Sequence, residues 1–253
     1  MTQIPIALQL YTVRDATEKD LSGTFAELSA IGYRNVELAG HYGLSSSELK
    51  AKLEAADLKP ISAHVGLSEL EGANVGKTIE SYLDLGVSTV VVPHLGDNDR
   101  LGGAGYPAVA ERLNAAGELL SKYGVTIGYH NHDFEFRETF EGKSGIETLI
   151  EKTDPALVTF ELDTYWALFA DNDPVAFINK HATRLSLLHI KDLDPTDRSF
   201  APVGTGSLPL DGIVDAAVNA GVRYLIVEQD TCKLSSVESV KISLTNLKAK
   251  GYA

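Results

Sequence analysis

Pairs of ionisable residues two positions apart recur at the ends of short apolar segments. His130 and His132 form one pair in GYHNH (128–132), and Glu161 and Asp163 form another in TFELD (159–163). On a strand, residues two apart point to the same face, so each pair presents two polar groups to one side. A carboxylate within an apolar strand is costly in free energy unless it is paired or bound to a metal. The pattern therefore predicts a site where such groups meet.

Other segments end in the same way. LLHIK (187–191) carries His189 and Lys191, and LIVEQD (225–230) carries Glu228 and Asp230. A lone histidine at a strand end more often packs through a hydrogen bond, so the prediction depends on many such groups converging. Carboxylate and imidazole ligands suit a divalent metal such as Mg, Mn, Zn, Co or Fe, and a dication would relieve repulsion among the acids. Further polar residues end the remaining segments, namely Gln9, Tyr11, Glu37, His64 and His94.

Short apolar segments that alternate with longer amphipathic ones must position these groups. The short segments are rich in Val, Ile and Leu, which is typical of strands buried on both faces. We expect eight strands, at Ile4–Leu10, Asn35–Leu38, Pro60–His64, Thr89–His94, Val125–Asn131, Leu157–Asp163, Leu185–Ile190 and Tyr224–Glu228.

Helical patterns lie between these strands, and a glycine follows several of them as a stop signal, for example Gly32 and Gly124. Regular alternation of strand and helix predicts parallel strands with right-handed crossovers. The expected helices span Asp20–Ile31, Ser46–Ala56, Val75–Leu85, Pro107–Tyr123, Gly145–Lys152, Pro174–His181, Leu210–Ala220 and Val237–Lys250.

Eight such units can close into an α/β fold of the TIM barrel type, the (β/α)8 barrel. A barrel of this type uses about 250 residues as one unit, so we expect one domain over residues 1–253. An open doubly wound sheet is the competing fold, but LQLYTVRDAT (8–17) after the first strand lacks the GxGxxG turn. Asp97–Gly105 and Asp194–Ser207 are the most loop-like stretches. In a barrel, chemistry gathers at the carboxyl ends of the strands.

The composition narrows the class of partner. The 22 Lys and Arg residues against 35 Asp and Glu give a formal charge of −13. This charge disfavours nucleic acid and anionic membranes, and it favours a small polar substrate bound through a cation. The single cysteine, Cys232, excludes a disulfide within the chain. No apolar run approaches the length of a membrane span, so we expect a cytoplasmic protein.

The strand ends resemble the xylose isomerase-like TIM barrel superfamily of sugar phosphate isomerases and epimerases, and inosose dehydratase-like and 3-keto-sugar-processing members are closest in pattern. The resemblance implies a barrel enzyme that removes a proton next to a carbonyl through a metal-stabilised enediolate. It is carried, in order along the chain, by LQLYTVRD (8–15), SAHVG (62–66), GYHNHDFEF (128–136), FELDTYW (160–166), LLHIKD (187–192), VGTGSLPL (203–210) and VEQD (227–230).

The resemblance also implies a set of metal ligands. Members of the superfamily usually supply Glu, Asp, His and Glu from strands five to eight. Asp163, His189 and Glu228 stand at the last three of these positions. His130 stands where the first glutamate is common. Either His130 is the fourth ligand, or a carboxylate such as Glu135 or Glu161 replaces it.

The same resemblance implies roles for residues near these ligands. His132 and Glu161 are candidates for proton transfer, followed by Glu135. Trp166 is a sugar-stacking platform or a core residue. Lys191 donates to a substrate oxygen or pairs with Asp230 at the rim. We expect substrate contacts from Gln9, Tyr11, Glu37, His64, His94, Trp166 and Lys191, and only surface or loop roles for His41 and His181.

Several functions remain open at this point. Isomerisation or epimerisation of a keto sugar is the expected reaction, with dehydration of a keto sugar or inosose as the alternative on the same site. A non-catalytic sugar-binding barrel is a further alternative, whereas phosphodiester hydrolysis is disfavoured by the net charge. The GTG at 204–206 is weak evidence for a phosphate site. A homodimer through the outer helices stays open.

Overall fold

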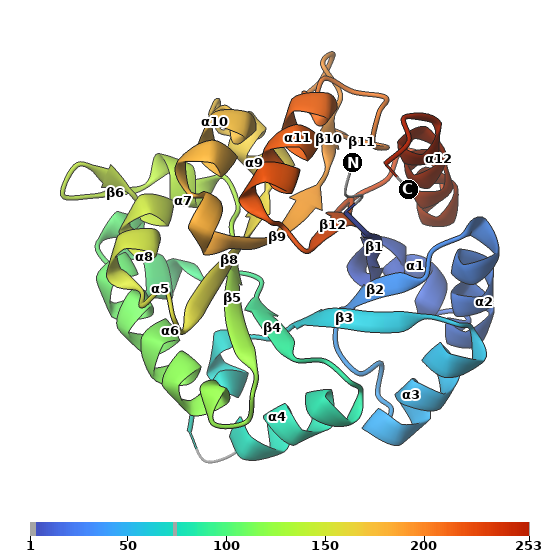
Figure 1. Cartoon of the computed structure of the whole chain (residues 1–253), viewed down its shortest axis with the longest axis horizontal. Coiled ribbons are helices and arrows are strands. Elements are labelled where there is room, and N and C mark those ends of the chain that lie inside the picture. Colours follow the sequence, from blue (N-terminus) through green and yellow to red (C-terminus); the bar gives the residue numbers. More distant parts are fainter. Residues whose placement is uncertain (1–3, 73–74, 253) are drawn as a thin grey trace.

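Eight parallel strands close into a barrel in the computed structural model, which describes residues 4–72 and 75–252 (Figure 1). The strand order is β1-β12-β9-β8-β5-β4-β3-β2, and pairing of β1 with both β12 and β2 completes the ring. The predicted (β/α)8 barrel is confirmed. The strands span β1 Ile6–Gln9, β2 Asn35–Leu38, β3 Lys59–His64, β4 Thr89–Val92, β5 Thr126–His130, β8 Val158–Asp163, β9 Leu185–Ile190 and β12 Tyr224–Val227.

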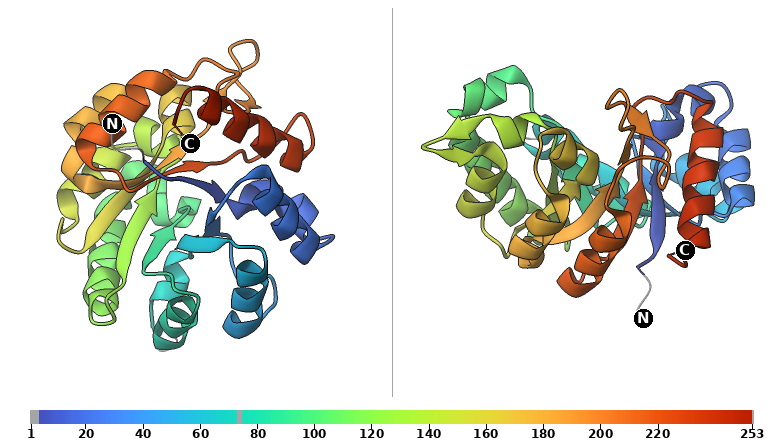
Figure 2. Two further views of the ribbon diagram at one scale, coloured as in Figure 1. Left: turned by 45° about the vertical axis from the view of Figure 1, so that its right-hand side comes forward. Right: turned by 90° about the horizontal axis from the view of Figure 1, so that it is seen from above.

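Helices surround the strands on the outside of the barrel (Figures 1 and 2). Their ends follow the signals in the sequence, since Asp20 and Ser45 cap the first turns of α2 and α3, and Gly32 ends α2 at a φ of 116°. All eight expected helices are present, with ends within two residues of the prediction. They are α2 Leu21–Ile31, α3 Ser46–Ala55, α4 Val75–Asp84, α6 Tyr106–Ser121, α8 Gly145–Lys152, α10 Pro174–Lys180, α11 Leu210–Ala220 and α12 Ser236–Ala249.

The two stretches expected to be loops contain short regular elements, which corrects that expectation. Asp97–Arg100 forms α5 and Leu101–Gly103 a turn of 3-10 helix. Arg100 holds this segment in place, because its guanidinium pairs with Glu138 and lies 3.9 Å from the ring centroid of Phe134. In the second stretch, β11 (Phe200–Ala201) pairs antiparallel with β10 (Asp192–Leu193). The remaining short elements are α1 Arg14–Thr17, α7 Phe134–Arg137, α9 Thr164–Phe169, β6 Thr139–Phe140, β7 Lys143–Ser144 and the 3-10 helices Leu10–Val13, Leu67–Leu70 and Ala182–Arg184.

Buried apolar side chains form two separate clusters in the barrel fold. Ala7, Val91, Leu187 and Ile226 are fully or almost fully buried and form a small cluster of their own. A much larger cluster lies between the strands and the outer helices. No helix in the described part of the chain is long and apolar enough to span a membrane.

Strand register brings polar residues side by side at the carboxyl ends. His130 pairs with Glu161 across β5 and β8, and Asp163 pairs with His189 across β8 and β9. On the other side of the barrel, Gln9 of β1 pairs with Glu37 of β2. Parallel strands all end at the same rim, so residues far apart in sequence meet there.

Candidate active site

Four buried side chains place potential metal donors around one point. One donor atom from each of His130, Asp163, His189 and Glu228 lies within 4.8 Å of the others. They come from the ends of β5, β8 and β9 and from the residue after β12. Two imidazoles and two carboxylates form a donor set that suits a divalent transition metal, so the residues fit the ion that the sequence predicts.

A second group shares one member with the first. Glu37, His64, Glu161 and His189 also bring donor atoms within 4.8 Å of one another. His189 lies between the groups, with Nδ1 2.7 Å from Oε2 of Glu228 and Nε2 2.8 Å from Oε1 of Glu37. Burial lowers the pKa of His189, but Glu161 and Glu228 outweigh it and hold that pKa well above its usual value.

Glu161 belongs to the second group and carries an unpartnered oxygen. Its Oε2 lies 2.9 Å from Nε2 of His64 and 3.1 Å from Nε2 of His189. Its Oε1 is buried without a hydrogen-bond partner among the described residues. A buried carboxylate oxygen without a donor is costly, so this atom is a natural acceptor for a further proton or cation.

Lys191 is buried among three carboxylates. Its Nζ lies 2.9 Å from Oδ2 of Asp163, 2.6 Å from Oε2 of Glu228 and 2.8 Å from Oδ1 of Asp230. The predicted pairing with Asp230 is present, but the lysine is only 1% exposed. The expected position of Lys191 at the rim is therefore wrong. Its positive charge offsets the negative charges of Asp163 and Glu228, two of the four potential metal ligands.

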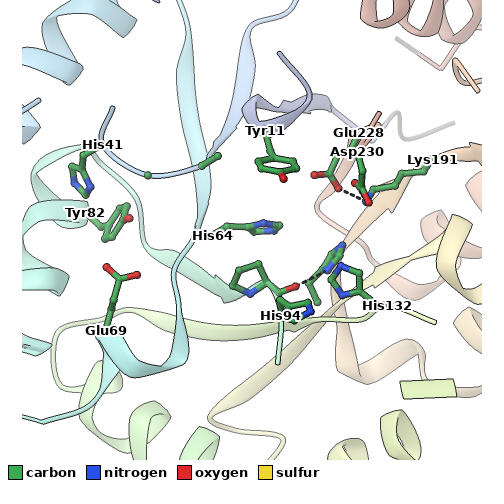
Figure 3. Close-up of a pocket in the computed structure, with 14 residues that line it drawn as sticks. Tyr11, His41, His64, Glu69, Tyr82, His94, His132, Lys191, Glu228 and Asp230 are labelled. Atoms are coloured by element: carbon green, nitrogen blue, oxygen red, sulfur yellow. Dashed lines mark hydrogen bonds and ion pairs between the residues drawn. The ribbon is translucent and has the colours of Figure 1, made fainter. Parts of the chain in front are cut away.

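A cavity of about 590 Å³ opens above the cluster (Figure 3). Four of the expected substrate contacts, Tyr11, His64, His94 and Lys191, line it, and so does His132, the candidate for proton transfer. The wall is completed by Ala39, Gly40, His41, Glu69, Tyr82, Pro93, His130, Glu228 and Asp230.

Gln9 and Glu37 do not reach the cavity, in contrast to the expectation for them. Both are fully buried, and Nε2 of Gln9 donates to Oε1 of Glu37 at 2.8 Å. Ser62 Oγ donates to the other oxygen of Glu37 at 2.5 Å. Gln9 of β1 and Ser62 of β3 thus hold Glu37, a member of the second group, in place.

Trp166 is not part of the cavity wall either. Its ring packs against Tyr165, Phe169 and Phe200, with centroids 4.9 to 5.6 Å away. Its backbone N–H donates to Oδ1 of Asp163, because Asp163 caps the first turn of α9. Its ring centroid also lies 5.4 Å from that of the cavity residue His132, so both roles that the sequence left open for Trp166 stay predictions.

His132 presents its ring to the cavity just beyond the end of β5. It stacks on Phe134 at a centroid distance of 5.3 Å and an interplanar angle of 12°. Its Nδ1 is buried and has no hydrogen-bond partner among the residues described. Burial, together with His130 and Lys191, lowers the pKa of His132 to about 2, so the ring is uncharged at neutral pH.

Glu135 does not line the cavity, which argues against a direct role for it. The side chain is fully buried, receives a hydrogen bond from the Tyr129 hydroxyl, and accepts the backbone N–H of His132 at 2.7 Å. Burial raises the pKa of Glu135 to about 8. Glu135 thus supports the loop that carries His132, and it is outside both donor groups.

Three residues of the cavity wall with polar side chains were not predicted to belong to the site. His41 follows the end of β2, Glu69 lies in the 3-10 helix Leu67–Leu70, and Tyr82 lies on α4. His41 lies in a loop, as expected, but it also lines the cavity, which the sequence did not predict. His41 carried the same signal as His64, a polar residue shortly after a strand, whereas Tyr82 carried none.

The GTG segment binds an internal carboxylate. Backbone N–H groups of Gly204, Gly206 and Leu208 each donate to Asp192 at 2.9 Å. A phosphate would need these same amides. The loop is therefore stabilised from within the chain, and the weak signal for a phosphate site finds no support here.

Fold and donor cluster together define a TIM barrel with polar side chains converging at the carboxyl ends of its strands. The chain belongs to the family described as xylose isomerase-like TIM barrel, which matches residues 25–249.

Individual relatives agree with this membership. The chain is 29% identical over 197 residues to an inosose dehydratase from Halalkalibacterium halodurans, covering 72% of this chain and 61% of that one. The chain thus spans about three fifths of the length of that relative. A sugar phosphate isomerase/epimerase from Parabacteroides distasonis is 28% identical, with a TM-score of 0.80 over 100% of this chain and 96% of that one. A protein called IOLI, solved with a bound zinc atom, shares the fold at 15% identity, with a TM-score of 0.72 over 99% of each chain.

Proposed function

We propose that this chain is a metal-dependent enzyme that isomerises or epimerises a keto sugar. The observation that carries the proposal is the meeting of His130, Asp163, His189 and Glu228 within 4.8 Å at the barrel mouth. These four residues would hold the ion, with His130 as the fourth ligand in place of the glutamate common in the family. A divalent ion bound there would stabilise negative charge that develops on a substrate carbonyl oxygen.

His132 is the group we propose to move the proton. It lines the cavity, its Nδ1 lacks a partner, and Glu135 holds its backbone N–H. A neutral imidazole beside the carbon next to the carbonyl accepts the proton and leaves an enediolate. Return of the proton to the opposite face gives an epimer, and its return to the neighbouring carbon gives an isomer. Glu161 positions His64 and His189 from below the cavity.

Dehydration is the second candidate on the same site. Inosose dehydratases are prominent among the curated relatives, for example one from Bacillus cereus that is 24% identical over 84% of this chain. The first step is the same removal of a proton by His132, after which a hydroxide leaves from the next carbon. The two reactions differ in whether water is lost.

Glu228→Gln tests the proposal most directly. The variant removes one carboxylate charge and should lose bound metal while the barrel stays folded, because Glu228 lies outside both apolar clusters. Elemental analysis of the purified proteins measures metal per chain, and Glu111→Gln on the exposed side of α6 is the matched control. Full metal occupancy in Glu228→Gln would refute the ligand assignment.

Activity is then tested with keto sugars and inososes in deuterated water. Deuterium incorporation without loss of water supports isomerisation or epimerisation, and loss of water supports dehydration. A wild-type protein that binds sugar but holds no metal and exchanges no proton would be a binding module. Four further expectations stay predictions: a single domain, a homodimer, a cytoplasmic location and no nucleic-acid partner.

A further inference from the structure

The cavity extends well past the donor cluster. In Figure 3, Lys191 and Glu228 lie at one end, and His41, Glu69 and Tyr82 lie at the other, with His64 between them. The three far residues come from the loop after β2, the 3-10 helix Leu67–Leu70 and helix α4. A reacting keto sugar held near Lys191 and Glu228 would leave this far end unfilled.

The far end combines aromatic ring surface with polar groups, one of which lacks a hydrogen-bond partner. The rings of His41 and Tyr82 lie 4.6 Å apart, and Tyr82 is only 4% exposed. Nε2 of His41 is buried and has no hydrogen-bond partner in the described part of the chain. Glu69 is exposed, and its Oε1 accepts the backbone N–H of Gly66 at 3.2 Å. Such a mixture of apolar surface and a few hydrogen-bonding groups fits a hydroxylated ring.

The charged residues that line the cavity disfavour an anionic group at its far end. Among the described residues that line the cavity, Lys191 is the only lysine or arginine, and three carboxylates already contact its ammonium. Glu69 adds a negative charge to the far wall. A phosphate there would meet a carboxylate and no free cation, which is unfavourable at these distances.

We propose that His41, Glu69 and Tyr82 form a subsite for an uncharged sugar ring that is joined to the reacting keto sugar. The substrate is then a keto glycoside, and a sugar phosphate is excluded. The identity of the reacting end rests on the proposed function, whereas the subsite is defined by its own three residues.

Three matched substrates test the subsite. Keto derivatives of maltose, glucose and glucose 6-phosphate, with the carbonyl at the same position of the reacting ring, are compared by deuterium exchange. We expect the highest kcat/KM for keto maltose and the lowest for the phosphate. In the double variant His41→Gln/Glu69→Gln, the loss for keto maltose should exceed the loss for keto glucose by about tenfold, the usual effect of a hydrogen bond to a charged group. Glu80→Gln, exposed on α4, is the control.

Two results would overturn the subsite. One is equal kcat/KM for keto maltose and keto glucose, and the other is an equal loss for both in the double variant. If none of the sugars exchanges, the proposed reaction fails and calorimetric titration with maltose decides on the subsite alone. Saturable maltose binding that weakens in the double variant supports it, and the absence of maltose binding to the wild type refutes it.

Discussion

Nζ of Lys191 lies 2.6 Å from Oε2 of Glu228, the same oxygen that lies 2.7 Å from Nδ1 of His189. The same Nζ atom also lies 2.9 Å from Oδ2 of Asp163. An ion held by Asp163 and Glu228 would draw on the same two carboxylates, so the lysine ammonium and a divalent ion would compete for them. Buried charges interact strongly at such distances because little water screens them.

Replacement of Lys191 by methionine should tighten metal binding. Without the ammonium, Asp163 and Glu228 keep their full charge for the ion, and we expect the Kd for zinc or manganese to fall by about tenfold or more. The metal-free variant should unfold at a lower temperature than the metal-free wild type, because two buried carboxylates lose their cation. Calorimetry and thermal unfolding with a chelator measure the two effects.

Lys50→Met, at an exposed position of α3, is the control for this change. It should alter neither the metal affinity nor the stability of the metal-free protein. An unchanged Kd in Lys191→Met would show that the ammonium does not oppose the ion.

Replacement of His132 by glutamine should separate proton transfer from metal binding. The residue lies outside the donor group of His130, so metal content should stay at the wild-type level. Deuterium exchange into a keto sugar should fall by about 10²- to 10⁴-fold, the usual contribution of a general base. His181→Gln, at the end of α10, serves as the control because it lies outside the cavity. Exchange at the wild-type rate would remove His132 from the base role.

The barrel was predictable because its signal repeats. Each strand is a short run of β-branched and aliphatic residues, each helix has a periodic apolar face, and parallel strands bring their carboxyl ends to one rim. Asp163, His189 and Glu228 each lie within one residue of the end of their strands, so strand order alone places them together.

The depth of each side chain was not predictable in this way. Gln9 and Tyr11 are two residues apart, yet Gln9 is fully buried and Tyr11 is 44% exposed. Strand β1 ends at Gln9, and Tyr11 lies in the 3-10 helix Leu10–Val13, where the alternation of a strand no longer applies. Glu135 is similar, because the short helix α7 turns its carboxylate under the backbone of His132.

Long-range packing decided the remaining positions. Trp166 packs against Phe200, which lies 34 residues further along the chain in strand β11. Strand β11 pairs with β10, and neither strand shows a clear alternating pattern in the sequence. Tyr82 reaches the cavity from an amphipathic helix, α4, whose Val75 and Ile79 are buried in the core. Neither contact has a local signal, so only the assembled structure identifies them.

Removal of the Asp192 side chain should destabilise the GTG loop. Asp192→Ala leaves the backbone N–H groups of Gly204, Gly206 and Leu208 without their acceptor. We expect a loss of about 2 to 4 kcal/mol in the free energy of unfolding, measured in urea, since hydrogen bonds to a charged group are strong and buried donors are costly to leave unpaired. Asp215→Ala, exposed on α11, should cost far less. Equal effects of the two variants would contradict this role for Asp192.

Glu135 should make the stability of the protein fall as the pH rises. Burial raises its pKa from 4.5 to about 8 in the folded chain, so between these values the folded state keeps a proton that the unfolded state has released. The stabilising contribution is complete below pH 4.5 and is lost as the pH rises through about 8. Glu135→Gln removes this titration while it keeps an acceptor for the Tyr129 hydroxyl.

The measurement is the free energy of unfolding of wild type and Glu135→Gln across this pH range. Relative to the variant, the wild type should lose up to about 1.4 kcal/mol per pH unit within the window and nothing below it. Any hydrogen bond that the amide makes less well adds an offset that does not depend on pH, so the slope alone tests the argument. Glu118→Gln, exposed on α6, should run parallel to the wild type. Parallel curves for Glu135→Gln as well would mean that the buried carboxyl is already ionised in the folded protein near pH 5.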